Sequence, residues 1–268
     1  MLSIIISSAN PALLKNVQQN IKDTVGVPYE IIIFDNSKGV NGLCKLYNEG
    51  THKAKFDTLC FMHEDVEIKT INWGKKVIDY FDKDPQLGLI GLAGSSYKSA
   101  IPSGWHDVDI TSCLNYVNII QAYKRQPRGD VYLHSNPKHE KLLQGFHVYD
   151  IDFSLAVNQE YKVAVTFEIL LKHFSEGDYN FSWFKDIIKI HKKWNYVLPI
   201  NLEGLSSERA AVVEKKKFRS FIRDYHKFLT ITESMRILYQ SKIYKLNFFT
   251  YLKLYSSIVK RHTKKLFT

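Results

Sequence analysis

Short apolar runs alternate with amphipathic segments through the first 95 residues. The apolar runs are rich in β-branched residues and predict buried strands at Leu2–Ser7, Tyr29–Phe34, Thr58–Met62 and Leu87–Leu92. The segments between them predict helices that begin at Asn10-Pro11, cover residues 42–55 and cover Trp73–Phe81. Strands that are apolar on both faces and are separated by helices predict an α/β fold with a mostly parallel sheet flanked by helices.

Polar or small residues follow each predicted strand. They are Ser7-Ser8, Asp35-Asn36, Glu64-Asp65 and Gly94-Ser95, of which the last pair is interpreted as a turn. The carboxyl ends of parallel strands meet at one edge of a sheet, and open parallel sheets bind their ligands there. We therefore expect a ligand site at this edge.

The pattern changes after the fourth predicted strand. Residues 96–148 are irregular, and Tyr161–Leu171 is strand-like and ends just before His173. After Gly204 the spacing becomes helical, with Ser206 or Ser207 as the cap. Apolar residues of this part recur every three or four positions, at Phe218, Phe221, Ile222, Tyr225, Phe228 and Leu229. We predict an α/β domain over residues 1–204 and a helical extension over residues 205–268.

The charges separate the same two parts. The 268 residues carry a formal net charge of +10. Residues 1–204 hold 22 Lys and Arg against 23 Asp and Glu, a net charge of −1, whereas residues 205–268 hold 15 against 4, a net charge of +11. The whole basic excess therefore lies in the extension, which indicates that the two parts have different roles.

The sequence contains no signal for export or membrane insertion. Met1 leads directly into the first apolar strand without a basic region or cleavage site. No run approaches the roughly 18 to 20 apolar residues that a spanning helix needs. The cysteines, Cys44, Cys60 and Cys113, have neither paired nor zinc-binding spacing, which predicts reduced, mostly buried thiols. We expect a cytoplasmic protein.

Acidic residues after the second and third strands could bind a nucleotide and a metal. Asp35 can accept hydrogen bonds from a ribose or a base, or it can simply stabilise a turn. The first strand lacks the GxGxxG turn of dinucleotide-binding folds, which speaks against an oxidoreductase of that type. The acids of His63-Glu64-Asp65 can hold a divalent cation against phosphate oxygens, or they can form a solvated loop.

Two later positions complete the set of candidates. Asp150 and Asp152 lie two residues apart in an apolar stretch, and at a helix start one of them can act as a general base, or both can only cap the helix. His173 can be a metal ligand or a hydrogen-bonded loop residue. Taken in order, the candidates fit one scheme, with a nucleotide-binding acid, metal-binding acids, a base and a metal-binding histidine.

This order and several short motifs resemble the family-2-type glycosyltransferases of the GT-A fold, in the branch described as a glycosyltransferase-like family. The motifs lie at residues 3–8, 29–36, 46–50, 61–66 (with HEDV), 91–95, 105, 145–155 (with FHxYDIDFSL), 173 and 193–194. The resemblance implies a GT-A catalytic domain over residues 1–204. It also implies transfer of a sugar from a nucleotide-sugar donor, here a UDP-sugar, to an acceptor hydroxyl with Mn²⁺ or Mg²⁺.

The resemblance assigns roles to individual residues. The residues of the nucleotide pocket would be Ser7, Ser8, Asn10, Asp35, Asn36, Asn48 and Glu64. Asp65 would bind the metal at the place of the family's DXD motif, which begins with His63 here, and His173 would complete the metal site. Asp150 would deprotonate the acceptor, so that in-line attack inverts the anomeric centre. The residues assigned to the sugar or the acceptor are Trp105 and Asp152.

One segment departs from the family pattern. Members carry an Asp-Gly pair before the base that helps to frame the sugar, and residues 106–144 contain none. A nucleotide-sugar-binding protein that does not catalyse transfer is therefore an alternative function. A nucleotidyltransferase fits less well, because Ser7-Ser8-Ala9-Asn10 lacks the basic residue of a phosphate loop.

The basic extension has three interpretations. Its helices can pack on the α/β domain with a solvated basic face. They can also contact an anionic membrane, because Lys245–Lys265 mixes Phe, Tyr and Leu with basic residues as interfacial helices do. That contact would suit a saccharide or lipid-linked acceptor of a bacterial cell envelope and a location on the inner face of the cell membrane. Nucleic-acid binding is the third interpretation, and the lack of a nucleic-acid-binding motif speaks against it.

Overall fold

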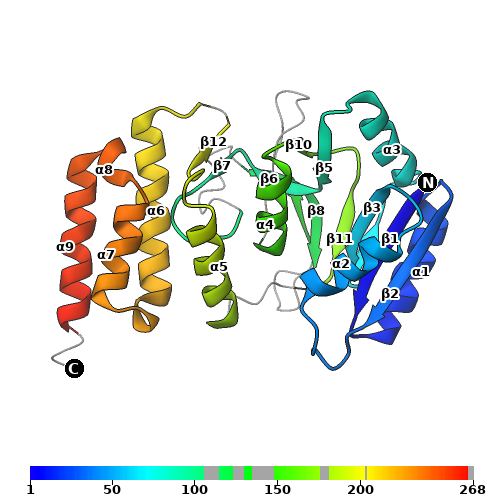
Figure 1. Cartoon of the computed structure of the whole chain (residues 1–268), viewed down its shortest axis with the longest axis horizontal. Helices are drawn as coiled ribbons and strands as arrows, with labels where there is room; N and C mark the ends of the chain where they lie inside the picture. Colours follow the sequence, from blue (N-terminus) through cyan, green and yellow to red (C-terminus); the bar gives the residue numbers. More distant parts are fainter. Residues whose placement is uncertain (106–114, 123–129, 135–147, 176–180, 203, 265–268) are drawn as a thin grey trace. The chain divides into compact units, whose positions relative to one another are not determined.

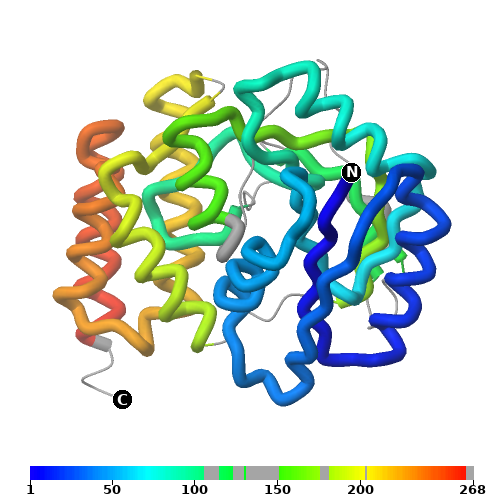
Figure 2. The backbone as a smooth tube through the Cα atoms, turned by 45° about the vertical axis from the view of Figure 1, so that its right-hand side comes forward, coloured from blue at the N-terminus to red at the C-terminus, as the bar shows by residue number. Residues whose placement is uncertain are grey.

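The computed structural model describes residues 1–105, 115–122, 130–134, 148–175, 181–202 and 204–264, except for the side chains of residues 131–134, 148–150 and 264 (Figures 1 and 2). The chain divides into two compact units, and each is described by itself. Unit 1 comprises the described residues of 1–93, 117–134 and 157–175, and unit 2 comprises the others. The domain boundary expected at residue 204 stays a prediction.

Unit 1 begins with a parallel three-stranded sheet. Its strands are β1 (Leu2–Ser8), β2 (Tyr29–Asp35) and β3 (Thr58–His63), in the order β2-β1-β3. Ser8 lies beside Asp35, and Ser7 lies beside His63. All three strands therefore end at the same edge, and the predicted parallel arrangement is confirmed for them.

Two helices pack against opposite faces of β1, because successive side chains of a strand point to opposite sides. α1 (Pro11–Thr24) begins as predicted at Asn10, whose side chain accepts hydrogen bonds from the N–H groups of Ala12 and Leu13. The residues of α1 and β1 that share one core are Val17, Ile21, Leu2, Ile4 and Ile6. On the other face, Gly50 of α2 (Leu43–Lys53) lies so close to Ile5 that an added Cβ would come within 2.5 Å of its side chain.

Short strands and one more helix complete unit 1. The elements are β4 (Val66–Ile68), α3 (Trp73–Lys83), β5 (Leu87–Gly91), most of β8 (Asn115–Ala122), β9 (Asp130–His134), β10 (Lys162–Val165) and β11 (Leu171–His173). β10 pairs in parallel with β5. β11 pairs antiparallel with β4 and parallel with β8, and β9 pairs antiparallel with β8.

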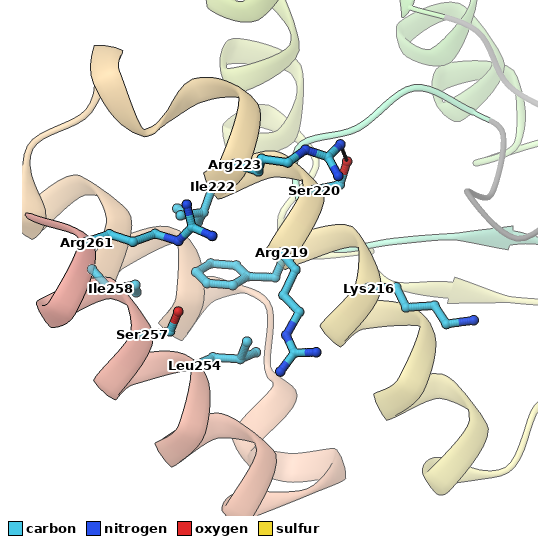
Figure 3. A pocket seen from close by; sticks show the side chains of 10 residues that line it. Lys216, Arg219, Ser220, Ile222, Arg223, Leu254, Ser257, Ile258 and Arg261 are labelled. Atoms are coloured by element: carbon cyan, nitrogen blue, oxygen red, sulfur yellow. Dashed lines mark hydrogen bonds between the residues drawn. The ribbon is translucent and has the colours of Figure 1, made fainter.

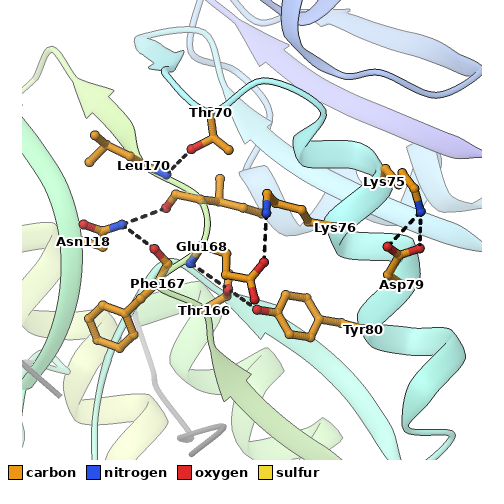
Figure 4. A network of polar contacts seen from close by, with 11 residues as sticks. Thr70, Lys75, Lys76, Asp79, Tyr80, Asn118, Thr166, Phe167, Glu168 and Leu170 are labelled. Carbon is orange, nitrogen blue, oxygen red and sulfur yellow. Dashed lines mark hydrogen bonds and ion pairs between the residues drawn. The ribbon is translucent and has the colours of Figure 1, made fainter. Parts of the chain in front are cut away.

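A polar network fixes the segment between β10 and β11 (Figure 4). Asn118 of β8 donates a hydrogen bond to the carbonyl of Phe167 at 2.8 Å, and Lys76 of α3 pairs with Glu168 at 2.9 Å. The N–H of Leu170 donates to the hydroxyl of Thr70 at 2.8 Å. These contacts hold the chain immediately before β11 and thereby fix the position of that strand.

Unit 2 is mainly helical. Outside the extension it contains α4 (Val148–Val157, whose last residue belongs to unit 1), α5 (Phe181–Lys193) and the antiparallel pair of β7 (Tyr97–Lys98) and β12 (Ile200–Asn201). The extension consists of α6 (Ser207–Tyr225), a 3₁₀ turn (His226–Phe228), α7 (Ile231–Gln240), α8 (Ile243–Leu246) and α9 (Phe248–Lys264). Figures 1 and 2 show α6, α7 and α9 side by side. Among the described helices, none combines the length and apolar character needed to cross a bilayer.

The extension shares its core with other parts of unit 2. The apolar residues that α5 and the extension bury together are Phe184, Phe218, Phe221, Ile222, Ile237, Leu238, Ile243, Leu254 and Ile258. Glu214 of α6 is fully buried and accepts hydrogen bonds from the hydroxyls of Tyr97 and Ser99 and from the N–H of Ala100, at 2.9, 2.8 and 3.0 Å. The helices of the extension are therefore attached to residues 97–101 by both apolar and polar contacts.

Several expectations need correction. The region Tyr161–Leu171 contains two short strands, β10 and the start of β11, rather than one. The pair Gly94-Ser95 lies in β6 (Ala93–Ser95) rather than in a turn, and residues 96–148 contain β7, β8 and β9. Cys44 is exposed, not buried, while burial raises the pKa of the Cys60 thiol to about 12. Strands as short as these form through partners distant in the chain, which the local pattern does not reveal.

Candidate functional site

A cavity of about 410 Å³ lies at the carboxyl ends of β1, β2 and β3. Its lining residues, all from unit 1, are Ser7, Ala9, Leu13, Asn36, Leu43, His63, Glu64, Asp65, Phe174 and Ser175. Four of the predicted site residues, Ser7, Asn36, Glu64 and Asp65, are therefore brought together. Their cavity lies at the edge where open parallel sheets bind ligands.

Glu64 and Asn36 shape the walls of this cavity. The Glu64 carboxylate accepts hydrogen bonds from the backbone N–H groups of Ala9 and Asn10, each at 3.0 Å, and so closes the turn between β1 and α1. The Asn36 side chain exchanges two hydrogen bonds with the backbone of Asn41, at 2.9 and 3.2 Å. Both loops are thus held in place by the protein's own side chains, and the cavity is formed before any ligand arrives.

Asp65 differs from these residues in its hydrogen bonds. Its Oδ1 atom is buried, and no described residue donates a hydrogen bond to it. Its Oδ2 atom lies 3.6 Å from Nε2 of His173, and the Asp65 backbone carbonyl accepts a hydrogen bond from the N–H of Phe174 at 2.9 Å. A buried carboxylate oxygen without a donor is costly, so this atom is available for a ligand that carries positive charge or an N–H or O–H group.

The ring of His173 is oriented by Gln121 of β8. The Gln121 amide N–H₂ donates to the carbonyl of Ser175 at 2.8 Å, which turns its Oε1 atom toward Nδ1 of His173, 3.1 Å away. Nδ1 therefore carries the proton, and Nε2 keeps its lone pair on the side of Asp65. Metal-binding histidines are typically held in this way by a second hydrogen bond. The Ser175 hydroxyl, at 3.4 Å from Nε2, is a long contact by comparison.

Asp65 and His173 together fit a divalent cation that is also bound by its substrate. Among the described residues, no cluster of three or more His, Cys, Asp or Glu side chains could hold a metal by itself. Mg²⁺ and Mn²⁺ sites that handle phosphates often use only one or two protein ligands, with phosphate oxygens and water as the others. A carboxylate oxygen without a partner beside an imidazole lone pair matches that donor set.

His63 lies beside this pair and is mostly uncharged at neutral pH. Desolvation lowers the pKa of its ring, the nearby His173 lowers it further, and Asp65 and Glu64 oppose the shift. A neutral ring adds no positive charge that would repel a cation at Asp65. His63 stands where the family motif has an acid. Because its ring is mostly neutral, it does not offset the negative charge of Asp65.

The other predicted nucleotide residues do not line the cavity. Ser8 is buried, and its carbonyl accepts a hydrogen bond from the N–H of Asn36. Asn10 caps α1, and Asn48 is exposed on α2. Asp35 is exposed at the end of β2, where a hydrogen bond from the N–H of Ser37 at 2.9 Å lowers the pKa of its carboxyl. Asp35 is thus ionised and accessible next to Asn36, whereas the Ser8 carbonyl and the Asn10 side chain hold the backbone around the cavity.

Three predicted residues belong to unit 2. Asp150 lies in the first turn of α4, as expected for an acid at a helix start, and its side chain is outside the described residues. Asp152 accepts hydrogen bonds from Lys193 and from the indole N–H of Trp194, at 2.7 and 2.5 Å, which attaches α4 to the end of α5. Trp105 is half-buried and packs against the apolar core of this unit. Asp152 and Trp105 therefore have structural roles, whatever they contact besides.

The sequence did not point to several residues of the site. Gln121 lies in a strand within a stretch that was expected to be irregular, and its role depends on a contact with His173, 52 residues later. Phe174 and Ser175 enter the cavity because they follow β11. Leu13 and Leu43 come from the first turns of α1 and α2. Their proximity to the strand ends is the one property that could have identified them.

The chain was compared with curated proteins and with protein-family models. No curated protein matches the chain. A family model described as "Glycosyltransferase like family" matches residues 3–176, which is 174 of the 268 residues and includes the whole lining of the cavity. Because the match covers more than half of the chain, the protein belongs to the glycosyltransferase-like family, whose members transfer a sugar from a nucleotide-sugar donor to an acceptor.

Proposed function

We propose that the protein is a metal-dependent, inverting glycosyltransferase that uses a UDP-sugar and binds the diphosphate of the donor at Asp65 and His173. The observation that carries the proposal is the buried, unpartnered Oδ1 atom of Asp65 beside the oriented Nε2 atom of His173. Both belong to the unit that is matched by the family model.

The loops around the cavity would hold the nucleoside. Asp35 is ionised and exposed, so it can accept hydrogen bonds from a ribose hydroxyl or from the N–H of a uracil ring. Ser7 and Asn36 line the same cavity as Asp65, and Asn36 follows Asp35 in the chain. Glu64 keeps the β1–α1 turn in place, so a nucleotide meets a wall that is already formed.

A bound Mn²⁺ or Mg²⁺ would neutralise the charge that develops on the departing diphosphate. Asp65 and His173 would hold the cation, and Gln121 would keep the imidazole in the binding orientation. His63, which is mostly neutral, leaves the negative charge of Asp65 undiminished. The residues thus contribute position and charge, and the ligand is needed to complete the coordination.

Asp150 is the proposed general base. It lies in the first turn of α4, where the positive end of the helix stabilises a carboxylate. It would remove the proton of the acceptor hydroxyl during in-line attack on the anomeric carbon. Asp150→Asn should leave donor binding unchanged and lower transfer to the acceptor by about 100-fold or more. Transfer at the normal rate by this variant would rule out the role.

The experiment that tests the function is a screen of nucleotide sugars with Mn²⁺ or Mg²⁺. It measures release of nucleoside diphosphate and the shift of the melting temperature, for the natural protein and for Asp65→Asn. Asp57→Asn is the matched control, because Asp57 is exposed at the opposite end of the same strand. Metal-dependent release that Asp65→Asn abolishes and Asp57→Asn retains supports the proposal. Absence of any metal-dependent response to nucleotides would refute it.

The same screen separates transfer from binding alone. The lack of an Asp-Gly pair in residues 106–144 favours a protein that binds the donor without turning it over. In that case UDP with metal would raise the melting temperature, and no donor and acceptor pair would release diphosphate. Turnover of any donor above the background rate excludes this second candidate.

We also propose that the extension contacts an anionic membrane surface from the cytoplasmic side. α9 exposes Phe248, Phe249, Leu252 and Tyr255 together with Lys253, and Lys245 is exposed on α8, just before α9. This combination is typical of helices that lie in the lipid interface, and it would suit a lipid-linked acceptor. Phe249→Ser with Leu252→Ser should lower sedimentation with anionic vesicles several-fold. Unchanged sedimentation of the double variant would contradict the contact.

A further inference from the structure

A second cavity lies within unit 2, between α6 and α9 (Figure 3). Its volume is about 690 Å³. The polar residues that line it are Lys216, Arg219, Ser220, Arg223, Ser257 and Arg261, and the described lining contains no acidic residue. A cavity of this composition is built for an anion, and neither the family match nor the proposed transfer reaction accounts for it.

Two of the arginines have guanidinium groups that no described acid neutralises. Arg223 is paired with Asp224, at 2.7 Å, and it also contacts the hydroxyl of Ser220. In contrast, no described residue forms an ion pair with Arg219 or Arg261. Figure 3 shows both side chains reaching into the space between the two helices, while Lys216 points away from it. The positive charge available to a ligand therefore comes from one arginine on each helix.

The helices hold these groups at fixed positions. Ser257 and Arg261 are four residues apart on α9 and thus lie on one face, and Ser257 is half-buried. The floor beneath them consists of Phe218, Ile222, Leu254 and Ile258, which are almost completely buried in the core of the unit. Because the floor is rigid and closed, a ligand would meet the arginines and the hydroxyl rather than the apolar side chains.

We infer that this cavity binds a phosphate group between Arg219 and Arg261. A guanidinium group presents two parallel N–H donors to a pair of phosphate oxygens, and two arginines offset the negative charge of a phosphate group. The Ser257 hydroxyl can donate to a further oxygen. The phosphate belongs to a lipid headgroup at a membrane surface or to a free phosphorylated compound, and the experiment distinguishes these two sources.

The test uses the full chain with two probes. Pyrophosphate is titrated by calorimetry in the presence of EDTA, which removes the divalent cation that the donor cavity would require. Vesicles of phosphatidylglycerol are compared with vesicles of phosphatidylcholine by sedimentation. The variants are Arg219→Gln, Arg261→Gln and the double variant. Arg209→Gln is the matched control, because Arg209 is exposed on the same helix, ten residues or about 15 Å from Arg219.

Each single variant should weaken pyrophosphate binding by about tenfold and the double variant by about 100-fold, while Arg209→Gln changes it by less than about twofold. If the double variant also loses its preference for phosphatidylglycerol, the phosphate is that of a lipid headgroup. If its vesicle binding is unchanged, the ligand is a soluble phosphate compound. In both cases the response of the donor cavity to UDP and Mn²⁺ should remain, since it depends on residues of the other unit.

Three results would overturn the inference. One is equal binding of both probes by the natural protein and the double variant, which includes the case in which neither probe binds. Another is an equal loss with Arg209→Gln, which would mean that the whole basic surface acts through its charge. An oligonucleotide that binds far more tightly than pyrophosphate, with equal sensitivity to all three arginines, would likewise replace the phosphate pocket by a nucleic-acid surface.

Discussion

Two carboxylates, one in each unit, have opposite surroundings. Glu214 of α6 is completely enclosed and accepts hydrogen bonds from Tyr97, Ser99 and Ala100. Asp65, just after β3, has a buried oxygen to which no described residue donates a hydrogen bond, and its other oxygen lies 3.6 Å from Nε2 of His173. The first carboxylate is satisfied by the protein, and the second is not.

The difference separates structural acids from ligand-binding acids. A buried charge is tolerated where donors surround it, and removal of such a charge leaves the donors unsatisfied. A buried carboxylate oxygen without a hydrogen-bond donor lowers the stability of the fold. Such an atom is expected where a bound ligand supplies the missing interaction. Glu214 should therefore be needed for folding, and Asp65 for binding. Substitutions at both positions can test whether the two roles are separable.

The largest expected effect is that of Glu214→Gln on stability. The amide keeps one oxygen, but its NH2 group would face at least one of the three hydrogen-bond donors, and the buried Lys98 would lose the nearby negative charge. Such a change costs about 3 to 5 kcal/mol of unfolding free energy. Urea denaturation measures it, with Glu160→Gln on the exposed surface as the control, for which a change within about 0.5 kcal/mol is expected. Equal stability of the two variants would show that Glu214 is not a structural acid.

Asp65→Asn should have the second-largest effect, and on binding instead of folding. An amide is a poor ligand for a hard divalent cation, so metal-dependent UDP binding should fall by about 100-fold, or about 2.7 kcal/mol. Unfolding free energy should stay within about 1 kcal/mol or rise slightly, because the substitution removes a charge that no described donor stabilises at Oδ1. Calorimetry of UDP with Mn²⁺ and urea denaturation give the two values. A destabilisation as large as that of Glu214→Gln would remove the distinction.

The local pattern predicted the part of the fold that local interactions control. The sequence indicates the correct positions of β1, β2, β3 and the cap of α1 at Asn10. Apolar β-branched runs and a capping side chain act on residues that are close to them in the sequence. β7 to β9 did not follow from the pattern. Each has only two to eight residues, and its partner strand is chosen by tertiary packing.

The candidate site shows the same limit. The motif spacing predicts that Ser7, Asn36, Glu64 and Asp65 lie at one edge of the sheet, and all four line the cavity there. The spacing could not show that the Glu64 carboxylate accepts hydrogen bonds from the N–H groups of Ala9 and Asn10. Nor could it show that no described residue donates to Oδ1 of Asp65. Partners of Glu214 lie more than 110 residues earlier in the chain. Whether an acid is satisfied depends on such distant contacts, so its role is visible only in the structure.

Gln121→Leu tests how the binding orientation near Asp65 is maintained, and its effect should be smaller. Without the Oε1 acceptor the His173 ring can rotate or change its tautomer, so metal affinity should fall by about 10-fold to 100-fold. Gln121→Glu keeps an acceptor for Nδ1–H and should restore most of the affinity. Titration of Mn²⁺ in the presence of UDP measures both variants. A loss of the same size in Gln121→Glu would mean that Gln121 acts by packing and not by orienting the imidazole.

The smallest expected effect is the contribution of His191 to the pH dependence of stability. His191 is buried beside Lys98 and Ala100. Its Nε2 atom lies 2.8 Å from Nζ of Lys98, and burial, followed by Lys98 and Lys217, holds its pKa well below the ordinary value of 6.5. The unfolded chain therefore takes up a proton below pH 6.5 that the folded ring resists, so this contribution to stability is complete above pH 6.5 and is lost as pH falls. Between pH 7.5 and 5.5 the unfolding free energy of the natural protein should fall by about 1.4 kcal/mol more than that of His191→Gln.

The raised pKa of Glu214 changes stability in the opposite direction, but Glu214 is present in both proteins, so its contribution largely cancels in the difference. Urea denaturation at the two pH values measures the loss, and parallel pH profiles would show that the folded ring accepts the proton, which would remove His191 from the uncharged part of the core.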